Sequence, residues 1–204
     1  MGILSEYFTI FCDDGFGCIG SIGNKYTIIE EKGGGKKGMY YLVKEEKTNK
    51  LYVAKIYRDK KLAKNEIDIN KIIKDTNIQN IVEFIESGED IISLEEEETE
   101  KKEYIIFEYY AKGELLKYIN QSNGFKEKVV KIIFKKILET VKELHSKGIY
   151  HLDLNPANIL IDNDYNIKIG GFGFSVLGNE ENKGTFKGIK GSYNSHNYMC
   201  PQMF

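Results

Sequence analysis

The chain has 204 residues, of which 41% are hydrophobic and 29% are charged, as is usual for a soluble globular protein. Its net charge of −2 gives no electrostatic reason to expect a nucleic acid or an acidic membrane as partner. No apolar run reaches about 18 residues, so the sequence predicts no membrane span.

The cysteines and the N-terminal segment carry little functional information. Cys12, Cys18 and Cys200 are odd in number and scattered, so they outline neither a disulfide framework nor a zinc ligand set. Reduced thiols in an intracellular protein are expected, with a cytoplasmic location. Residues 1–25 match no pattern, and we interpret them as an N-terminal arm that precedes a domain at 26–204.

The first two predicted strands, Tyr26–Glu30 and Met39–Lys44, enclose a glycine-rich loop. Gly33, Gly35 and Gly38 satisfy the pattern G-x-G-x-x-G. Such a hairpin is often only a flexible turn, and a dinucleotide-binding fingerprint would need a helix after the glycines. A strand is predicted there instead, so the sequence does not predict a dinucleotide-binding fingerprint.

A lysine-bearing strand and a helix come next. Leu51–Tyr57 is predicted to be a strand, and alternation along it places Val53 on the same face as Lys55. A lysine in a strand is more often an exposed residue than a functional one. Lys61–Lys74 is predicted to be an amphipathic helix that carries Glu66.

The middle of the chain contains further strands and the longest helix. Val82–Ser87 and Tyr104–Tyr109 are predicted strands, and the charge run Glu95–Glu103 between them is predicted to be a solvated loop. A short helix is expected near Gly113–Asn120, followed by the longest one at Lys126–His145. An apolar stripe on the longest helix predicts a core face: Val130, Ile133, Phe134, Ile137, Leu138, Val141 and Leu144.

A polar cluster follows the longest helix and precedes two short apolar strands, Ile159–Ile161 and Ile167–Ile169. The strands hold a polar loop at one end, which suits a site presented at the mouth of a cleft. The cluster consists of His151, Asp153, Asn155 and Asn158.

This segment resembles the catalytic loop and the metal-binding loop of eukaryotic protein kinases, whose signatures are H-R-D-L-x-x-x-N and D-F-G. His151, Asp153, Leu154 and Asn158 match the first signature. Gly171-Phe172-Gly173 stands where D-F-G belongs, and Gly171 follows Asn158 by 13 positions, the interval usual in the family. An alignment slip therefore does not explain the missing aspartate.

Other motifs occur in the family's order. Lys55 follows Gly38 by 17 positions, as the family's strand lysine follows its last loop glycine, and Tyr198–Gln202 resembles the Y-M-A-P-E motif. The resemblance implies an α+β, bilobal fold, of which the chain spans about the first two-thirds. Its expected parts are a β-rich N-lobe at about 26–107, a hinge at 108–112 and an incomplete helical C-lobe at 113–204.

The resemblance also implies site roles, with ATP and Mg²⁺ as expected cofactors. Lys55 would pair with the α/β-phosphates and Glu66 would hold that lysine in place. Asp153 would accept the substrate hydroxyl proton, and Asn158 would ligate the metal. The implied ATP-binding residues are Gly33, Gly35, Gly38, Tyr40, Val53, Lys55, Phe107 (the gatekeeper), Glu108, Tyr110, Glu114 (the ribose contact) and Leu160.

Several departures from the family pattern weaken phosphotransfer. Gly171 cannot ligate a metal, and Asn155 replaces a lysine that steadies the γ-phosphate. If each loss is worth about 3 kcal/mol, transfer slows roughly 10⁴-fold. Leu152 replaces the arginine that pairs with a phosphorylated activation loop, while Tyr40 and Val53 are larger than the usual residues of the adenine pocket.

Three interpretations stay open on sequence alone. The chain is a pseudokinase that acts by binding another kinase or a regulatory protein, or it is a weakly active Ser/Thr protein kinase that uses Lys55, Asp153 and Asn158. The third is a degenerate fragment without function. Self-association through an uncovered face of the C-lobe is expected in addition.

Overall fold

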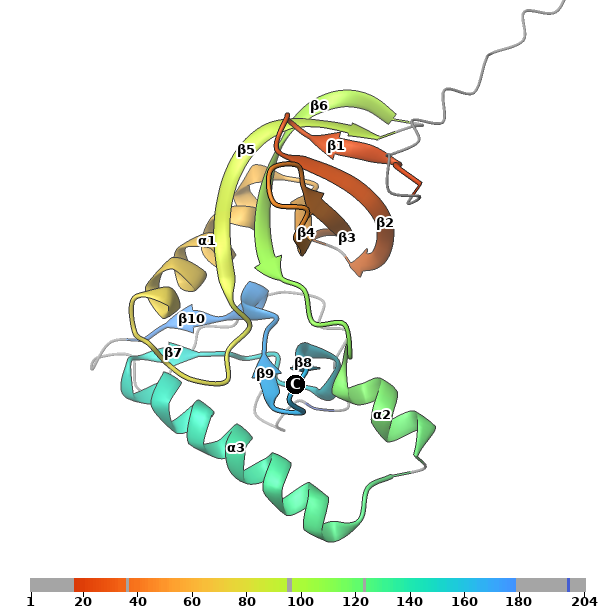
Figure 1. Ribbon diagram of the computed structural model, residues 1–204. Coiled ribbons are helices and arrows are strands. Elements are labelled where there is room, and N and C mark those ends of the chain that lie inside the picture. Colours follow the sequence, from red (N-terminus) through yellow and green to blue (C-terminus); the bar gives the residue numbers. More distant parts are fainter. Residues whose placement is uncertain (1–16, 36, 95–96, 123, 179–197, 199–204) are drawn as a thin grey trace, which may run out of the picture. The chain divides into compact units, whose positions relative to one another are not determined.

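The computed structural model describes residues 17–35, 37–94, 97–122, 124–178 and 198 (Figure 1). The chain divides into two compact units, one made of Met1–Ala63 and Ile85–Tyr109, the other of Lys64–Phe84 and Tyr110–Phe204. The first unit is built of strands, and the second contains most of the helical residues. The predicted fold class, α+β with a β-rich N-terminal part and few helices in the C-terminal part, is confirmed.

A closed barrel of strands forms the first unit (Figure 1). Its strands neighbour one another in the order β1-β2-β3-β4-β6-β5. Their bounds are β1 (Gly20–Ile22), β2 (Tyr26–Gly35), β3 (Gly38–Glu45), β4 (Leu51–Tyr57), β5 (Phe84–Leu94) and β6 (Glu97–Glu108).

Alternation along the strands produces the barrel core, because successive side chains point to opposite faces. On β4, Ala54 and Ile56 belong to this core, and Lys55 therefore lies on the opposite face of the strand. The buried core residues are Ile22, Tyr26, Ile28, Tyr41, Val43, Tyr52, Ala54, Ile56, Ile92, Tyr104 and Ile106.

The described part of the expected N-terminal arm contains a strand of the barrel, while the domain boundary expected at residue 26 stays a prediction. β1 pairs antiparallel with both β2 and β5, and Ile22 is fully buried in the core. A Cβ at Gly20 would lie within 3.0 Å of the carbonyl oxygen of Ser93. The sequence did not reveal this strand because its three residues, Gly20–Ile22, are too few to show an alternating pattern.

Two predicted loops are also corrected, since both are mainly strand. The glycine-rich segment continues β2 as far as Gly35, which pairs with Gly38 at the start of β3. The charge run lies largely in β6, from Glu97 onward. Backbone pairing with the neighbouring strands holds β6 in place, and its charged side chains form surface ion pairs, such as Lys101 Nζ to Glu89 Oε2 at 3.3 Å.

The second unit combines three helices with short strand pairs in its described part. Its elements are α1 (Lys60–Lys74, from Lys64 onward), α2 (Leu115–Gln121), α3 (Glu127–Ser146), β7 (Ile149–Tyr150), the 3₁₀ helix η1 (Pro156–Asn158), β8 (Ile159–Ile161), β9 (Ile167–Ile169), η2 (Phe172–Phe174) and β10 (Val176–Leu177). β8 pairs with β9, and β10 pairs with β7. Their apolar core contains Ile69, Ile73, Ile78, Ile81, Leu115, Leu144, Ile149, Ile159, Ile161, Ile167, Ile169 and Phe172.

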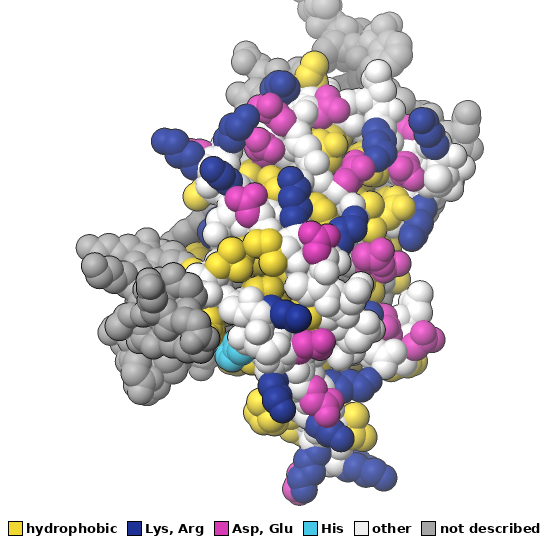
Figure 2. All heavy atoms as spheres, turned by 90° about the vertical axis from the view of Figure 1, so that its left-hand side faces the viewer, with side chains coloured by type: hydrophobic (Ala, Val, Ile, Leu, Met, Phe, Trp, Pro, Cys, Tyr) yellow, Lys and Arg dark blue, Asp and Glu magenta, His cyan; other side chains and the backbone are white. Residues whose placement is uncertain are grey.

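The apolar stripe predicted on α3 is only partly a core face. Leu144 is buried, but Val130, Phe134 and Leu138 are exposed, with 56% of Phe134 accessible. Hydrophobic side chains reach the surface in the lowest part of Figure 2, which contains the N-terminal half of α3. None of the described helices is long and apolar enough to cross a membrane.

The expected end of the activation segment, Tyr198–Gln202, lies outside the described residues except for Tyr198, which is exposed.

Candidate functional site

His151 anchors the loop that carries the candidate catalytic residues. The side chain is buried between two backbone partners: the Asp153 N–H donates to Nδ1 at 3.2 Å, and Nε2 lies 2.7 Å from the Gly170 carbonyl oxygen. With Nδ1 as acceptor, the single ring proton of the neutral imidazole sits on Nε2 and is donated to Gly170. Burial lowers the pKa of His151, although the carboxylates of Asp153 and Glu66 act in the opposite direction.

Two carboxamides hold Asp153 from both sides. Asn158 Nδ2 donates to Asp153 Oδ2 at 3.0 Å and to its backbone carbonyl at 2.7 Å. Asn155 Nδ2 donates to Asp153 Oδ1 at 3.3 Å and to the same carbonyl at 3.0 Å. Asn155 Oδ1 also accepts from the Ala157 N–H at 2.9 Å and caps η1. The asparagine at position 155 therefore stabilises the loop, while it lacks the positive charge of a lysine.

Both the backbone conformation at position 171 and the closeness of neighbouring atoms favour a glycine there. Its φ of +78° lies in the left-handed region, which favours glycine. A Cβ at this position would lie within 3.0 Å of Cγ, Oδ1 and Nδ2 of Asn158. The carboxamide of Asn158 therefore takes up the space next to the position where the family signature has an aspartate side chain.

These residues do not fit the Mg²⁺ site of a protein kinase. Mg²⁺ needs oxygen ligands in near-octahedral geometry. Gly171 offers no side-chain oxygen, and Asn158 Nδ2 donates to Asp153, so the two predicted ligand positions supply a single side-chain oxygen, Asn158 Oδ1. Within the ranges that the structure describes, no group of three or more His, Cys, Asp or Glu side chains is arranged to hold a metal ion.

A hydrogen-bonded relay connects α1 to the same loop. Asn65 Nδ2 on α1 donates to the carbonyl of Ser175 at 2.9 Å, and Ser175 Oγ donates to the carbonyl of His151 at 3.1 Å. Ser175 itself is fully buried. Glu66, the next residue on α1, is only 1% exposed and was predicted to hold the strand lysine. That pairing remains a prediction, because Glu66 and Lys55 belong to different units.

In the first unit, Lys55 lies between two aromatic rings. Its Nζ is 5.1 Å from the ring centroid of Tyr40 and also 5.1 Å from that of Tyr57. Tyr40 is the direct cross-strand partner of Lys55, whose side chain is only 5% exposed. Two further predicted ATP-site residues, Val53 and Phe107, are paired directly across β4 and β6.

The three glycines predicted to approach phosphates differ in what the fold demands of them. Gly33 has a φ of +102°, which other residues rarely adopt. A Cβ at Gly38 would lie within 3.0 Å of the carbonyl oxygen of Ile56 on β4. A Cβ at Gly35 would meet no atom within 4 Å. Barrel packing therefore accounts for Gly38, and backbone conformation accounts for Gly33.

Of the remaining predicted ATP-site residues, Glu108 belongs to the first unit, and Tyr110, Glu114 and Leu160 belong to the second. Glu108 ends β6, and one of its oxygens lies 3.7 Å from Lys50 Nζ. The Tyr110 hydroxyl accepts from the backbone N–H of Glu83 at 3.3 Å. Glu114 occupies the N-cap position of α2 and forms a single antiparallel bridge with Leu160 on β8.

Sequence reasoning missed Tyr57, Asn65 and Ser175 among the residues that contact the candidate site. Tyr57 stands two positions after Lys55 on one strand, so alternation was a signal that would have placed it on the lysine's face. Asn65 and Ser175 are 110 positions apart, and no local sequence pattern predicts their hydrogen bond.

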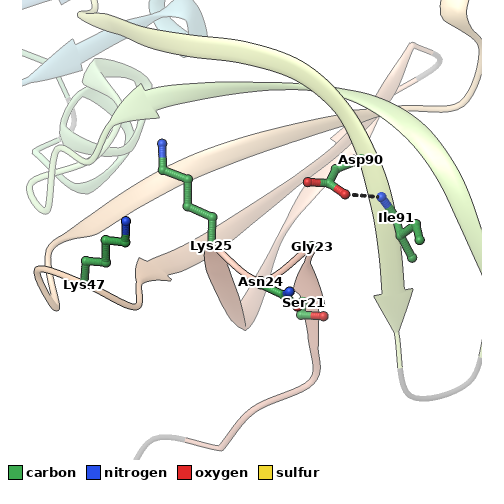
Figure 3. A pocket seen from close by; sticks show the side chains of 7 residues that line it. All are labelled: Ser21, Gly23, Asn24, Lys25, Lys47, Asp90 and Ile91. Atoms are coloured by element: carbon green, nitrogen blue, oxygen red, sulfur yellow. Dashed lines mark hydrogen bonds between the residues drawn. The ribbon is translucent and has the colours of Figure 1, made fainter.

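A surface hollow of about 670 Å³ opens at the rim of the barrel, lined by Ser21, Gly23, Asn24, Lys25, Lys47, Asp90 and Ile91 (Figure 3). Lys25 Nζ lies 2.5 Å from Glu86 Oε2 and 3.8 Å from Glu45 Oε1. The Asp90 carboxylate accepts from the Ile91 N–H at 2.8 Å. The positive charge of Lys25 is thus balanced within the protein, and the hollow shows no arrangement specific for an anion. Over the face drawn in Figure 2, positive and negative side chains are likewise intermixed.

Two features are those expected of a protein kinase domain. One is a barrel of strands with a lysine on β4, and the other is an H-x-D loop that is followed by the segment Gly171-Phe172-Gly173. The model of the family described as "Protein kinase domain" matches residues 26–204, and the chain belongs to this family.

Its relatives are serine/threonine kinases or carry kinase names. Serine/threonine-protein kinase cds1 of Schizosaccharomyces pombe is 28% identical over 91% of this chain and 39% of the relative. Carbon catabolite-derepressing protein kinase of Candida glabrata is 31% identical over 89% of this chain and 28% of the relative. CBL-interacting protein kinase 21 of Oryza sativa is 29% identical over 88% of this chain and 33% of the relative. The chain thus spans 28% to 39% of the length of these three relatives.

Proposed function

We propose that this protein kinase domain is a pseudokinase, which acts by binding other proteins and transfers phosphate at or near the background rate. One observation carries the proposal: the side chain of Asn158 packs against Gly171, where a kinase of the family places its metal-binding aspartate. Without that carboxylate, Mg²⁺ is not held at the β- and γ-phosphates, where it neutralises the developing charge. The absence of a lysine at position 155 removes a second positive contribution.

The state of Asp153 supports the same proposal. A catalytic base must reach the proton that it accepts. Both carboxylate oxygens of Asp153 are already hydrogen-bonded, one to Asn155 and the other to Asn158. A substrate hydroxyl would therefore share an oxygen that already accepts a hydrogen bond, since each carboxylate oxygen has about two lone-pair sites.

A weakly active serine/threonine kinase is the second candidate function. It is favoured by the retention of Asp153, Asn158 and Lys55 at the family's positions and by the partial exposure of Asp153. In this reading ATP binds with metal held by other groups, and Asp153 accepts the proton. The two candidates differ in whether any phosphotransfer depends on Asp153.

A protein partner is part of the proposal. The relative from Oryza sativa is named for its interaction with CBL, so kinase domains of this family occur in proteins that bind other proteins. The exposed apolar side chains on α3, among them Val130, Phe134 and Leu138, offer a surface for such contacts. Another kinase or a regulatory protein is the class of partner that we propose.

The test is a phosphotransfer assay read beside ATP binding with and without Mg²⁺. We expect no incorporation of labelled phosphate above the buffer background, and ATP affinity weaker than about 1 mM with little Mg²⁺ dependence. Incorporation that vanishes in Asp153→Asn but persists in Asp164→Asn, a change at an exposed carboxylate in the β8–β9 turn, would establish the weakly active kinase instead.

A further inference from the structure

Three side chains meet on one face of the barrel, the face opposite its core. Lys55 and Tyr57 are two positions apart on β4, so they share that face. Tyr40 on β3 is the direct cross-strand partner of Lys55 and points to the same side. Strand pairing therefore places Tyr40 beside the lysine, and alternation along β4 places Tyr57 on the same face, independently of any ligand.

The distances agree with attraction between the ammonium group and both rings. Lys55 Nζ lies 5.1 Å from each ring centroid, within the roughly 6 Å over which the negative face of an aromatic ring attracts a cation. The lysine is 95% shielded from water, at 5% exposure, and desolvation strengthens this attraction. Tyr40 is partly exposed, so it can be changed without disturbing the barrel core.

We propose that Tyr40 and Tyr57 form a tyrosine clamp on Lys55, and that the ring of Tyr40 sets the affinity of this lysine for the phosphates of a nucleotide. This inference rests on the proposed function, in which ATP binds weakly, and on the phosphate-contacting role that the family resemblance implies for Lys55. The side chain of residue 40 could also weaken nucleotide binding simply by filling the site. The clamp differs from this effect, because it depends on the aromatic face of residue 40 and not only on its volume. A phosphate oxygen must replace the attraction of the rings, which lowers nucleotide affinity.

Two substitutions at position 40 separate ring from bulk. Tyr40→Phe keeps an aromatic face over Lys55, whereas Tyr40→Leu keeps an apolar side chain of considerable volume and removes the face. Calorimetry with ATP, with and without Mg²⁺, is expected to show unchanged weak binding for Tyr40→Phe. For Tyr40→Leu we expect binding about tenfold tighter, the order of magnitude of one desolvated cation–π contact.

Equal affinities of the Phe and Leu variants, including no measurable binding by either, would overturn the role of the clamp in nucleotide binding. Tyr40→Met, which is also unbranched at Cβ and lacks a ring, repeats the test in case the Leu variant does not fold. Tight, Mg²⁺-enhanced binding by the unmodified chain would instead contradict the proposed function. The ratio of the ATP affinities of the Leu and Phe variants would still test the clamp. Failure of the proposed function and failure of the clamp are therefore distinguishable.

A second readout needs no nucleotide. In protein carrying ¹³C-labelled lysine, ring currents from Tyr40 and Tyr57 should shift the ε-methylene protons of Lys55 upfield. The signal is assigned by its loss in Lys55→Arg. It should move toward the position of an exposed lysine in Tyr40→Leu and stay shifted in Tyr40→Phe. An unshifted Lys55 signal in the unmodified chain would show that the clamp does not form in solution.

Discussion

At the scale of single residues, Gly171 is constrained by its neighbour as well as by its missing carboxylate. Its left-handed φ of +78° and the proximity of the Asn158 carboxamide both disfavour a side chain. Asn158 in turn is held by its two hydrogen bonds to Asp153. Restoring an aspartate at 171 therefore requires Asn158 to move, even when Asn155→Lys supplies the second missing charge.

We predict that Gly171→Ala and Gly171→Asp each destabilise the second unit by about 2 kcal/mol, from backbone strain and from disrupted hydrogen bonds of roughly 1 kcal/mol each. Removing the obstructing side chain with Asn158→Ala should reduce the cost of Gly171→Ala, which is measured as coupling in a double-mutant cycle of urea unfolding. Strictly additive free energies would contradict the contact between these two positions.

His151 gives the fold a pH dependence whose sign follows from its burial. Burial lowers the pKa of the folded imidazole below its ordinary value of 6.5. As the pH falls below about 6.5, the unfolded chain therefore binds a proton that the folded chain does not bind, and the unfolded state gains relative stability. The stabilisation is fully present above that value and is lost progressively as the pH falls toward the folded pKa.

We predict that the free energy of unfolding decreases between pH 7 and pH 5 more steeply in the unmodified chain than in His151→Phe, which has no proton to bind. The comparison concerns slopes, because the variant also loses two hydrogen bonds. His145→Gln, a change at an exposed histidine near the end of α3, is the control. Parallel pH profiles for the unmodified chain and His151→Phe would refute a buried neutral histidine.

At the scale of elements, the glycine-rich hairpin between β2 and β3 has structural as well as functional constraints. Gly38 lies so close to Ile56 on β4 that a Cβ would overlap its carbonyl oxygen, whereas Gly35 is surrounded by open space. The two glycines pair directly with each other, so they form a matched comparison within one hairpin.

We predict that Gly38→Ala destabilises the barrel by about 1–3 kcal/mol through overpacking, because β3 and β4 must separate. Gly35→Ala should stay within about 0.5 kcal/mol of the unmodified chain, since the new methyl group meets nothing. Thermal unfolding followed by circular dichroism measures both changes. A hairpin that tolerates both substitutions equally would mean that Gly38 is not limited by the approach of β4.

At the scale of the whole molecule, the described residues leave apolar side chains on α3 in contact with water. Val130, Phe134 and Leu138 lie at four-residue steps on one face of the helix and are exposed to 45%, 56% and 52%, respectively. Contiguous apolar surface of this kind usually marks an interface or a site of aggregation. We take a second copy of this chain as the expected partner when no other protein is present.

We predict that the chain self-associates as its concentration rises, seen as increasing mass in light scattering, and that Phe134→Ser with Leu138→Ser reduces the association. Ile91→Ser is the matched control, because Ile91 has a similar exposure of 53% but lies on β5 of the barrel. The apolar surface of α3 would be irrelevant to association if the unmodified chain stayed monomeric, or if the control reduced association to the same extent.

The sequence by itself determined the family, the α+β class and the locations of most helices and strands. These properties depend on local information: periodicity along one element, and motifs whose members are at most 17 positions apart. The replacement of the metal-loop aspartate by Gly171 is likewise readable from motif spacing alone. The family match over residues 26–204 confirms the family and does not bear on the role of Gly171.

The tertiary structure decided the features that depend on contacts between distant segments. β1 belongs to the barrel because it pairs with β5, and much of the charge run is strand because it pairs within the closed barrel. Only folding brings the Asn158 carboxamide against Gly171 and places Tyr40 beside Lys55. Local pattern does not encode such contacts, because each one depends on the register between strands or on the path of a loop through three dimensions.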